Sequence, residues 1–336
     1  MLLLENFNIF VLVNVLVKIV FSAKTFKPET CIIISKKELI FMHHEPVMLN
    51  EVIELIRTNS NNKSNLRILD GTLGVGGYSE AILKNFPDSH VLGIDRDESA
   101  IKFSRERLKD FNNFESLHAN FGNLDEIIKK FPAFDIFVFD LGVSNMQITS
   151  PERGFSFNVD GPLDMRMNPD GDSLTAREIL RDFDSKTLAK IFWEYGEERF
   201  SRQIASAIKR AKTPLNTTSE LVNLIRSTLP QPVQRKMGTH PARRVFQALR
   251  IYINNESGEL ENLLKSLHEI NNNALIIFVS YHSLEDRLIK KNFRQWQLEN
   301  YGKILTRHPL TPSENELESN YKSRSAKLRA FCIISN

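Results

Sequence analysis

The 336-residue sequence predicts an α/β protein built on a doubly wound parallel sheet with a helical insertion. Short apolar runs alternate with helical segments, the first run leads straight into a glycine-rich turn, and the alternation stops after the fourth run. Strands that are written as unbroken apolar runs are typical of parallel sheets whose two faces are both covered by helices.

The first half of the chain is predicted to form successive β-α-β units of the Rossmann type. Leu66–Asp70 is an apolar run that ends in an acid and enters the turn G-T-L-G-V-G-G, and His90–Asp95 is a second such run. Helix formers lie between them at Ser79–Asn85. Apolar spacing predicts a further helix from Ala100 to Leu108, and third and fourth strands are expected at Phe114–His118 and Phe134–Asp140.

The pattern changes after the fourth strand. A charged and aromatic loop, Glu152–Asn168, precedes a helical stretch from Thr175 to about Thr228. The alternation resumes with an expected helix at Arg244–Asn254 and expected strands at Ala274–Tyr281 and Leu328–Ile334.

These boundaries predict the domain organisation. We expect a catalytic domain formed by residues 42–144 and 241–336, and an inserted, mostly helical substrate-recognition domain at residues 145–240, between the fourth and fifth strands. Residues 1–41 fit neither part, and we expect them to precede a true start at Met42.

The alternative for residues 1–41 is a membrane-associated extension. Phe7–Phe21 is apolar but includes Asn14 and Lys18, and it is shorter than the roughly 20 residues that span a bilayer. A secretory signal is disfavoured because the leading segment has Glu5, no basic residue and no clear cleavage site after it.

Composition indicates an ordinary globular protein of a reducing compartment. Apolar residues make up 41% and charged residues 25% of the chain. Cys31 and Cys332 form no C-x-x-C pair, so neither a disulfide framework nor a metal site is expected. We expect a cytoplasmic protein with no membrane partner.

The positive charge is concentrated in one segment. Gly196–Arg250 holds eleven Lys or Arg residues against three Glu residues, although the whole chain carries only +3. Such a stretch is either a solvated helix face or a surface for nucleic acid, and a neighbouring catalytic domain favours nucleic acid. The residues expected to share an RNA-binding helix face are Arg199, Arg202, Lys209, Arg210 and Lys212.

Two cofactor classes compete for the glycine-rich turn. A dinucleotide site should read G-x-G-x-x-G, but here Gly74 and Gly76 are followed by Ser79, and Gly77 stands elsewhere. The acid directly before the turn, Asp70, suits a cationic ligand better than a diphosphate. S-adenosylmethionine, with its sulfonium and ammonium, is therefore the expected cofactor, and an NAD-dependent oxidoreductase is the disfavoured alternative.

Two further strand-end acids are candidate site residues. Asp95 ends the second strand, where a carboxylate can accept hydrogen bonds from ribose hydroxyls of either cofactor. Asp140 ends the fourth strand, beside the expected position of the transferred methyl group. The alternatives are a turn that needs glycine only for packing, and a turn or helix-capping role for Asp140.

Four unusual strings make the prediction more specific. They are H-E-P-V-M-L-N-E at His44–Glu51, E-R-G-F-S-F-N-V-D-G-P-L-D-M-R-M at Glu152–Met167, H-P-A-R-R-V-F-Q-A-L-R at His240–Arg250 and S-Y-H-S-L-E-D-R at Ser280–Arg287. Together they closely resemble the RsmH family, also called MraW, of ribosomal RNA small-subunit methyltransferases, over residues 43–335.

The resemblance implies a Rossmann-like S-adenosylmethionine methyltransferase sheet and methylation of the exocyclic 4-amino group of one cytidine in the decoding region of 16S ribosomal RNA. The implied partner is 16S ribosomal RNA or the small ribosomal subunit, and a homodimer is left open. The implied cofactor residues are Gly76, Gly77, Tyr78, Asp95, Phe121, Asp140 and Gln147, to which the residues of the turn add Asp70 and Gly74. Tyr78 and the segment S-N-M-Q at Ser144–Gln147 depart from the common family pattern.

The chemistry asks for alignment rather than a covalent nucleophile. The cytosine amino lone pair is delocalised into the ring, so acceptors for its N–H bonds must favour pyramidalisation and hold it in line with the methyl group. Asp140 and Ser144 are the expected catalytic acceptors, with Asp164 and His282 behind them. An extruded base needs stacking partners, for which Phe155, Phe157 and Tyr281 are candidates.

A different class of function is also open at this point. An RNA-binding ribosome assembly factor without turnover would use the same basic insertion. It would have no need for the intact glycines and strand-end acids, and measuring cofactor binding separates the two hypotheses.

Overall fold

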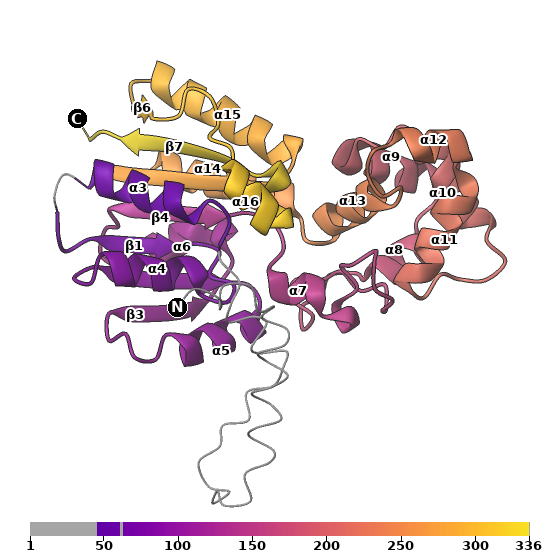
Figure 1. The fold of residues 1–336 in the computed structure, drawn as a ribbon, viewed down its shortest axis with the longest axis horizontal. Helices are drawn as coiled ribbons and strands as arrows, with labels where there is room; N and C mark the ends of the chain where they lie inside the picture. Colours follow the sequence, from indigo (N-terminus) through magenta and orange to yellow (C-terminus); the bar gives the residue numbers. More distant parts are fainter. Residues whose placement is uncertain (1–45, 61–62, 336) are drawn as a thin grey trace, which may run out of the picture. The chain divides into compact units, whose positions relative to one another are not determined.

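The computed structural model describes residues 46–60 and 63–335. Within them, seven strands form one sheet in the order β3-β2-β1-β4-β5-β7-β6 (Figure 1). The strands are β1 Arg67–Asp70, β2 His90–Asp95, β3 Phe114–His118, β4 Ile136–Asp140, β5 Ala274–Ser280, β6 Gly302–Ile304 and β7 Lys327–Ile333. β1 to β5 are parallel, and β7 runs antiparallel to both β5 and β6. The predicted fold class is confirmed, and β6 is the strand that the sequence did not predict.

The strand order places a crevice at the carboxyl ends of β1 and β4. β1 lies between β2 and β4, so the chain winds outward in opposite directions from this point. A ligand of a doubly wound sheet binds where the winding reverses. Asp70, Asp95 and Asp140 are the last residues of β1, β2 and β4, which brings the three predicted acids to one edge.

Helices cover both faces of the sheet because its side chains alternate between two apolar cores. Ile68 and Val138 pack with α3 (Leu49–Asn59) and α4 (Gly77–Asn85). Their neighbours Leu69 and Phe137 pack on the opposite face. The helices of that face are α6 (Leu124–Ile128), α14 (Glu256–His268) and α15 (Ser283–Leu298). Between β2 and β3 runs α5, Glu98–Arg107.

A third apolar core lies in the helices that follow β4, which Figure 1 shows as a group of their own. The helices that contribute buried residues to it are α8 Ala176–Asp182, α9 Ser185–Gly196, α10 Ser201–Arg210 and α11 Thr218–Thr228. The short helices α7 (Asn145–Thr149) and α12 (Gln231–Lys236) come before and after them in the chain. α13 (Arg243–Ile253) also belongs to this core through buried residues such as Val245 and Leu249. The domain boundaries stay a proposal, and these contacts favour ending the insertion after α13 instead of at residue 240.

The prediction for residues 1–41 lies outside the described residues, as do His44 and Glu45 of the first family-like string. Across the described part of the chain, no helix has the length and apolar character needed to cross a membrane.

Two short elements close the fold near the crevice. α16 (Glu314–Ser319) and the 3-10 turn η3 (Tyr321–Ser325) lie between β6 and β7. Glu316 of α16 accepts a hydrogen bond from the backbone N–H of Met48, at 2.7 Å. This bond joins the C-terminal segment to the start of α3.

Candidate active site

A cavity of about 580 Å³ opens at the carboxyl ends of the strands, within the size range of small-molecule sites. The glycine turn and the ends of β2 and β4 form one side of it. Phe157, His240 and Arg243 line it from the helical part, and Tyr321, Lys322 and Arg324 line it from η3. The cavity therefore has a part built by the sheet and a rim built by residues far away in the sequence.

The glycine turn is shaped by positive backbone angles and by close packing. Gly74 and Gly76 have φ of 50° and 79°, conformations that glycine adopts without steric cost. At Gly77 a Cβ atom would lie 2.6 Å from Pro46 Cγ. Gly74, Gly77 and Tyr78 line the cavity. Gly76 does not line it, because this residue is the N-cap of α4 and packs against Leu108.

Asp95 holds the glycine turn in place while lining the cavity. Its Oδ2 accepts the N–H of Gly74 at 2.8 Å, and its Oδ1 accepts the N–H of Asp97 at 2.8 Å. Each carboxylate oxygen has a second lone pair, so ribose hydroxyls can still bind. Burial raises the pKa of Asp95 to about 6.

Asp70 lies beneath the turn, and it is not one of the residues that line the cavity. It is fully buried, accepts the Ser79 hydroxyl at 2.7 Å and accepts the N–H of Thr72 at 3.3 Å. Burial raises its pKa to about 6. This placement makes Asp70 a support for the turn, and a direct cofactor contact has no geometric support.

Asp140 lines the cavity at the end of β4. Its Oδ1 accepts the hydroxyl of Tyr281 at 2.7 Å, and its backbone N–H donates to Thr72 Oγ1 at 2.6 Å. Burial raises its pKa to about 7, against the hydrogen bond from Tyr281 and the positive charge of Lys322, which both lower it. Asp140 thus titrates near neutral pH, which suits a group that handles a proton.

Two carboxylates with raised pKa values line the cavity, Asp95 and Asp140, and a third, Asp70, lies beneath the glycine turn, which together favour a cationic ligand. Each is penalised by burial when it is ionised, and a positive charge brought nearby offsets that penalty. The residues present therefore fit S-adenosylmethionine.

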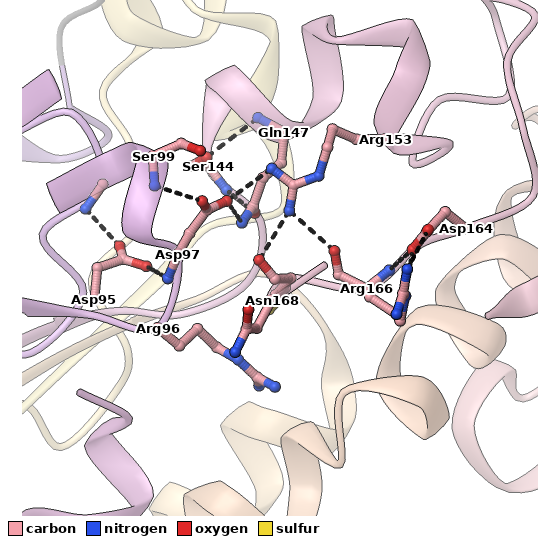
Figure 2. A network of polar contacts seen from close by, with 12 residues as sticks. Asp95, Arg96, Asp97, Ser99, Ser144, Gln147, Arg153, Asp164, Arg166 and Asn168 are labelled. Carbon is pink, nitrogen blue, oxygen red and sulfur yellow. Dashed lines mark hydrogen bonds and ion pairs between the residues drawn. The ribbon is translucent and has the colours of Figure 1, made fainter. Parts of the chain in front are cut away.

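Asp97 is the centre of a buried polar network between α5 and the loop after β4 (Figure 2). Its side chain is 1% exposed. Its Oδ2 accepts Gln147 Nε2 at 2.9 Å and Arg153 Nη1 at 2.8 Å, and its Oδ1 accepts the N–H of Ser99 at 3.0 Å. Because the N–H of Asp97 donates to Asp95, the network ends at the carboxylate that holds the glycine turn.

Arg153 extends this network into the family-like loop. Its Nη2 donates to the backbone carbonyls of Arg166 at 3.0 Å and Met167 at 2.8 Å. From the other side, Asn254 of the α13–α14 junction accepts the N–H of Met167 and donates to the carbonyl of Met165. Met165 has φ of 64°, so the loop is held in a conformation that its own side chain disfavours.

Gln147, which was predicted to contact the cofactor, has both polar atoms of its side chain bonded within the protein. Gln147 lines the cavity, but its Nε2 is bonded to Asp97 and its Oε1 accepts the N–H of Ser144 at 3.1 Å. Phe121, the remaining predicted residue, also lines the cavity and packs edge-on against Phe139.

The predicted amino-group acceptors other than Asp140 have local structural roles. Ser144 lines the cavity and caps α7, its Oγ accepting the N–H of Gln147 at 3.2 Å. His282 caps α15 and accepts the N–H of Glu285. Asp164 is paired with Arg166 at 2.9 Å. Only Ser144 joins Asp140 at the cavity.

His282 also belongs to a cluster with metal-ligand chemistry. Glu256, His282 and Glu285 bring ligand atoms within 4.8 Å of one another. Arg250, however, donates to both carboxylate oxygens of Glu256 at 2.8 Å each, so the cluster is an internal ion network.

One of the three predicted stacking residues is wrong. Phe155 is 8% exposed and lies in the core of the helical part, so it cannot receive a base. Phe157 lines the cavity and stacks on His240 with ring centroids 4.7 Å apart. Tyr281 lines the cavity next to Asp140, to which its hydroxyl donates.

The basic residues at the cavity are not those of the predicted helix face. Lys209 of α10 donates to the carbonyls of Leu180 and Arg181, at the end of α8, so its charge stabilises a helix terminus. At the cavity itself, Lys322 donates to the side-chain oxygen of Asn145, and burial lowers its pKa to about 8. Sequence reasoning missed Lys322 because it is distant from every motif.

Comparison with known proteins decides the family. Residues 41–334 match the MraW methylase family model. The chain belongs to this family. It is 40% identical over 309 residues to the ribosomal RNA small subunit methyltransferase H of Halothermothrix orenii, which covers 86% of this chain and 97% of the relative. It is 46% identical over 263 residues to the protein of the same name from Picosynechococcus sp., covering 78% and 88%.

A third relative, from Caldicellulosiruptor bescii, has the same name and is 40% identical over 307 residues, covering 85% of this chain and 97% of the relative. Membership of the MraW methylase family confirms the resemblance carried by the four strings. The family match extends across the sheet, the helical part and η3 alike.

Proposed function

We propose that this chain is an S-adenosylmethionine-dependent ribosomal RNA methyltransferase that methylates the exocyclic 4-amino group of a cytidine in the decoding region of 16S ribosomal RNA. The observation that carries the proposal is the cavity at the strand ends, lined by Asp95 and Asp140, in a member of the MraW methylase family. Its relatives are named ribosomal RNA small subunit methyltransferase H.

The sheet side of the cavity holds the cofactor. Asp95 binds the ribose hydroxyls, and the backbone N–H groups of Gly77 and Tyr78, at the start of α4, attract the carboxylate of the methionyl part. S-adenosylmethionine supplies the electrophilic methyl group. Asp70 keeps the turn in its binding conformation through Ser79 and Thr72.

Asp140 holds the amino group of the substrate. Its Oδ1 is bonded to Tyr281, so Oδ2 accepts an N–H of the cytosine and draws the nitrogen toward a pyramidal geometry. The pKa of Asp140 is about 7, and the positive charge of a bound cofactor would lower it further. The carboxylate is therefore ionised when the cofactor is bound. It can then take up the proton that the nitrogen loses after methylation.

The substrate side is proposed to bind 16S ribosomal RNA within the small subunit, in the cytoplasm. An extruded cytosine beside Asp140 would lie near Tyr281 and the stacked pair of Phe157 and His240. A catalytically silent assembly factor is the competing function. Calorimetry with S-adenosylmethionine separates them, because a silent factor has no requirement for cofactor affinity.

Nucleoside mapping tests the proposal in cells. Ribosomal RNA from cells with and without the gene is digested and compared by mass spectrometry. We expect loss of the N4-methyl group from one decoding-region cytidine, restored by the wild-type gene and not by Asp140→Ala. An unchanged methylation map would reject the function.

A further inference from the structure

The turn η3 (Tyr321–Ser325) brings an exposed aromatic ring and two cations to the cavity, and the proposed chemistry uses neither Tyr321 nor Arg324. Tyr321 is 72% exposed, although it lines the cavity. The guanidinium of Arg324 lies 4.4 Å from the centre of the tyrosine ring. One ring face is therefore covered by a cation, and the side chain keeps a large apolar surface in water.

The turn itself is firmly built. The side chain of Asn320 accepts the N–H of Lys322 at 3.3 Å, and the N–H of Ser323 donates to the carbonyl of Asn320 at 3.0 Å. Ser323 is fully buried. A ring held on such a turn loses little conformational freedom when it binds a partner, which favours a recognition role.

The turn also runs from the reaction site to the rim. Lys322 is partly buried, donates to Asn145 and acts electrostatically on Asp140. Its neighbour Tyr321 lies exposed on the rim. A polynucleotide whose target base reaches Asp140 can therefore place an adjoining nucleotide at this rim.

The charge and the aromatic ring of the rim favour RNA over a protein segment as the binding partner. Arg243 and Arg324 are exposed and line the cavity with Lys322, so this rim is positively charged. RNA bases stack on aromatic rings and guanidinium planes, while the phosphates beside them require cations. A hydrophobic protein segment would leave these cations without partners.

We propose that Tyr321, held by Arg324, is the stacking platform for a nucleotide next to the methylated cytidine. This inference rests on the proposed function and adds the residue that positions the RNA strand. The target base itself lies deeper, beside Asp140 and Tyr281. Tyr321 contributes to RNA binding and leaves the cofactor site unchanged.

Steady-state methylation of small subunits that lack the methyl group tests this platform. Tyr321→Ala should raise KM for the subunit about 5- to 150-fold, the range that stacking of one base on an aromatic side chain supplies. The kcat and the Kd for S-adenosylmethionine should stay at their wild-type values. Tyr321→Trp should restore KM, because a larger ring stacks equally well.

A matched variant and an altered RNA make the test specific. Trp193 is also exposed, at 58%, but does not line the cavity, so Trp193→Ala should keep the wild-type KM. Two kinds of small subunit are reconstituted, each with an abasic nucleotide on one side of the target. The wild-type enzyme should bind one of the two more weakly, by the factor that Tyr321→Ala costs. With that abasic position present, Tyr321→Ala should cause no further loss.

Three results would overturn the platform. They are an unchanged KM for Tyr321→Ala, a loss that Tyr321→Trp does not restore, and a full effect of the variant on abasic subunits, which would indicate a protein or phosphate contact. A wild-type enzyme that methylates no cytidine in these subunits would instead reject the proposed function, and the platform with it.

Discussion

Arg153 connects the loop over the cavity to Asp97, whose backbone N–H donates to Asp95, the acid that holds the glycine turn. Its removal should therefore loosen both the loop and the turn. The side chain is 15% exposed and makes one ion pair, with Asp97, and two hydrogen bonds to the carbonyls of Arg166 and Met167. Arg153→Met removes these three contacts while it keeps much of the side-chain volume. Asp97 keeps its bonds from Gln147 and Ser99, which limits the damage.

The expected loss of stability is about 2 to 4 kcal/mol. Breaking a buried ion pair by removing one partner costs about 3–5 kcal/mol, and the two remaining donors to Asp97 reduce that figure. Urea unfolding followed by far-UV circular dichroism measures it as a lower transition midpoint with an unchanged slope. Calorimetry should also show weaker S-adenosylmethionine binding, because Asp97 orients Asp95.

Arg181→Met is the matched control. Arg181 forms an ion pair with Asp182 at 2.6 Å, but both side chains are about half exposed. Its removal should leave the transition midpoint unchanged, because solvent screens an exposed pair. If Arg153→Met were no more destabilising than Arg181→Met, the proposed role of this network would be refuted.

Three further outcomes are expected. The positive charge of Lys322 lowers the pKa of Asp140, so Lys322→Met should raise that pKa and move the acidic limb of the pH profile of kcat/KM to higher pH. An unmoved limb would show that Asp140 is not the titrating group. The pKa of Asp140 is raised from 3.8 to about 7, so ionisation opposes folding as pH rises through this window. Asp140→Asn should therefore raise the melting temperature of the cofactor-free protein at pH 8 by about 2 to 8 °C, a gap that closes toward pH 4. A chain that starts at Met42 should fold and methylate like the full sequence, and its failure to fold would reject the expected later start.

The sheet was predictable because its signals are local. β1, β2 and β4 are buried apolar runs, and each ends in an acid that lies at the cavity or directly beneath it. β6 (Gly302–Ile304) was not predicted because three residues give no periodicity, and it forms only by pairing with β7. α13 was assigned to the catalytic part because its apolar spacing does not reveal which core it faces.

The site was predictable in its sheet half and not in its rim. Glycines and strand-end acids carry recognisable patterns, so Gly74, Asp95 and Asp140 could be named from the sequence. Arg153 could not be given a role, because its partner Asp97 is 56 residues away. Lys322 was missed for the same reason, since Asn145 lies 177 residues before it. Phe155 was wrongly predicted to stack on a base, because the sequence of a loop motif does not show whether its aromatic residue faces a cavity or a core.

The central claim is that the methyl group is transferred to the exocyclic 4-amino group of a cytidine, and one measurement tests it most directly. The purified protein is incubated with methyl-deuterated S-adenosylmethionine and small subunits from cells that lack the gene, and the ribosomal RNA is digested to nucleosides for mass spectrometry. We predict that the deuterated methyl group appears in N4-methylcytidine at one position of 16S ribosomal RNA, and that Asp140→Ala abolishes it. Label in 5-methylcytidine or in another nucleoside, or equal labelling by the Asp140→Ala protein, would contradict the account.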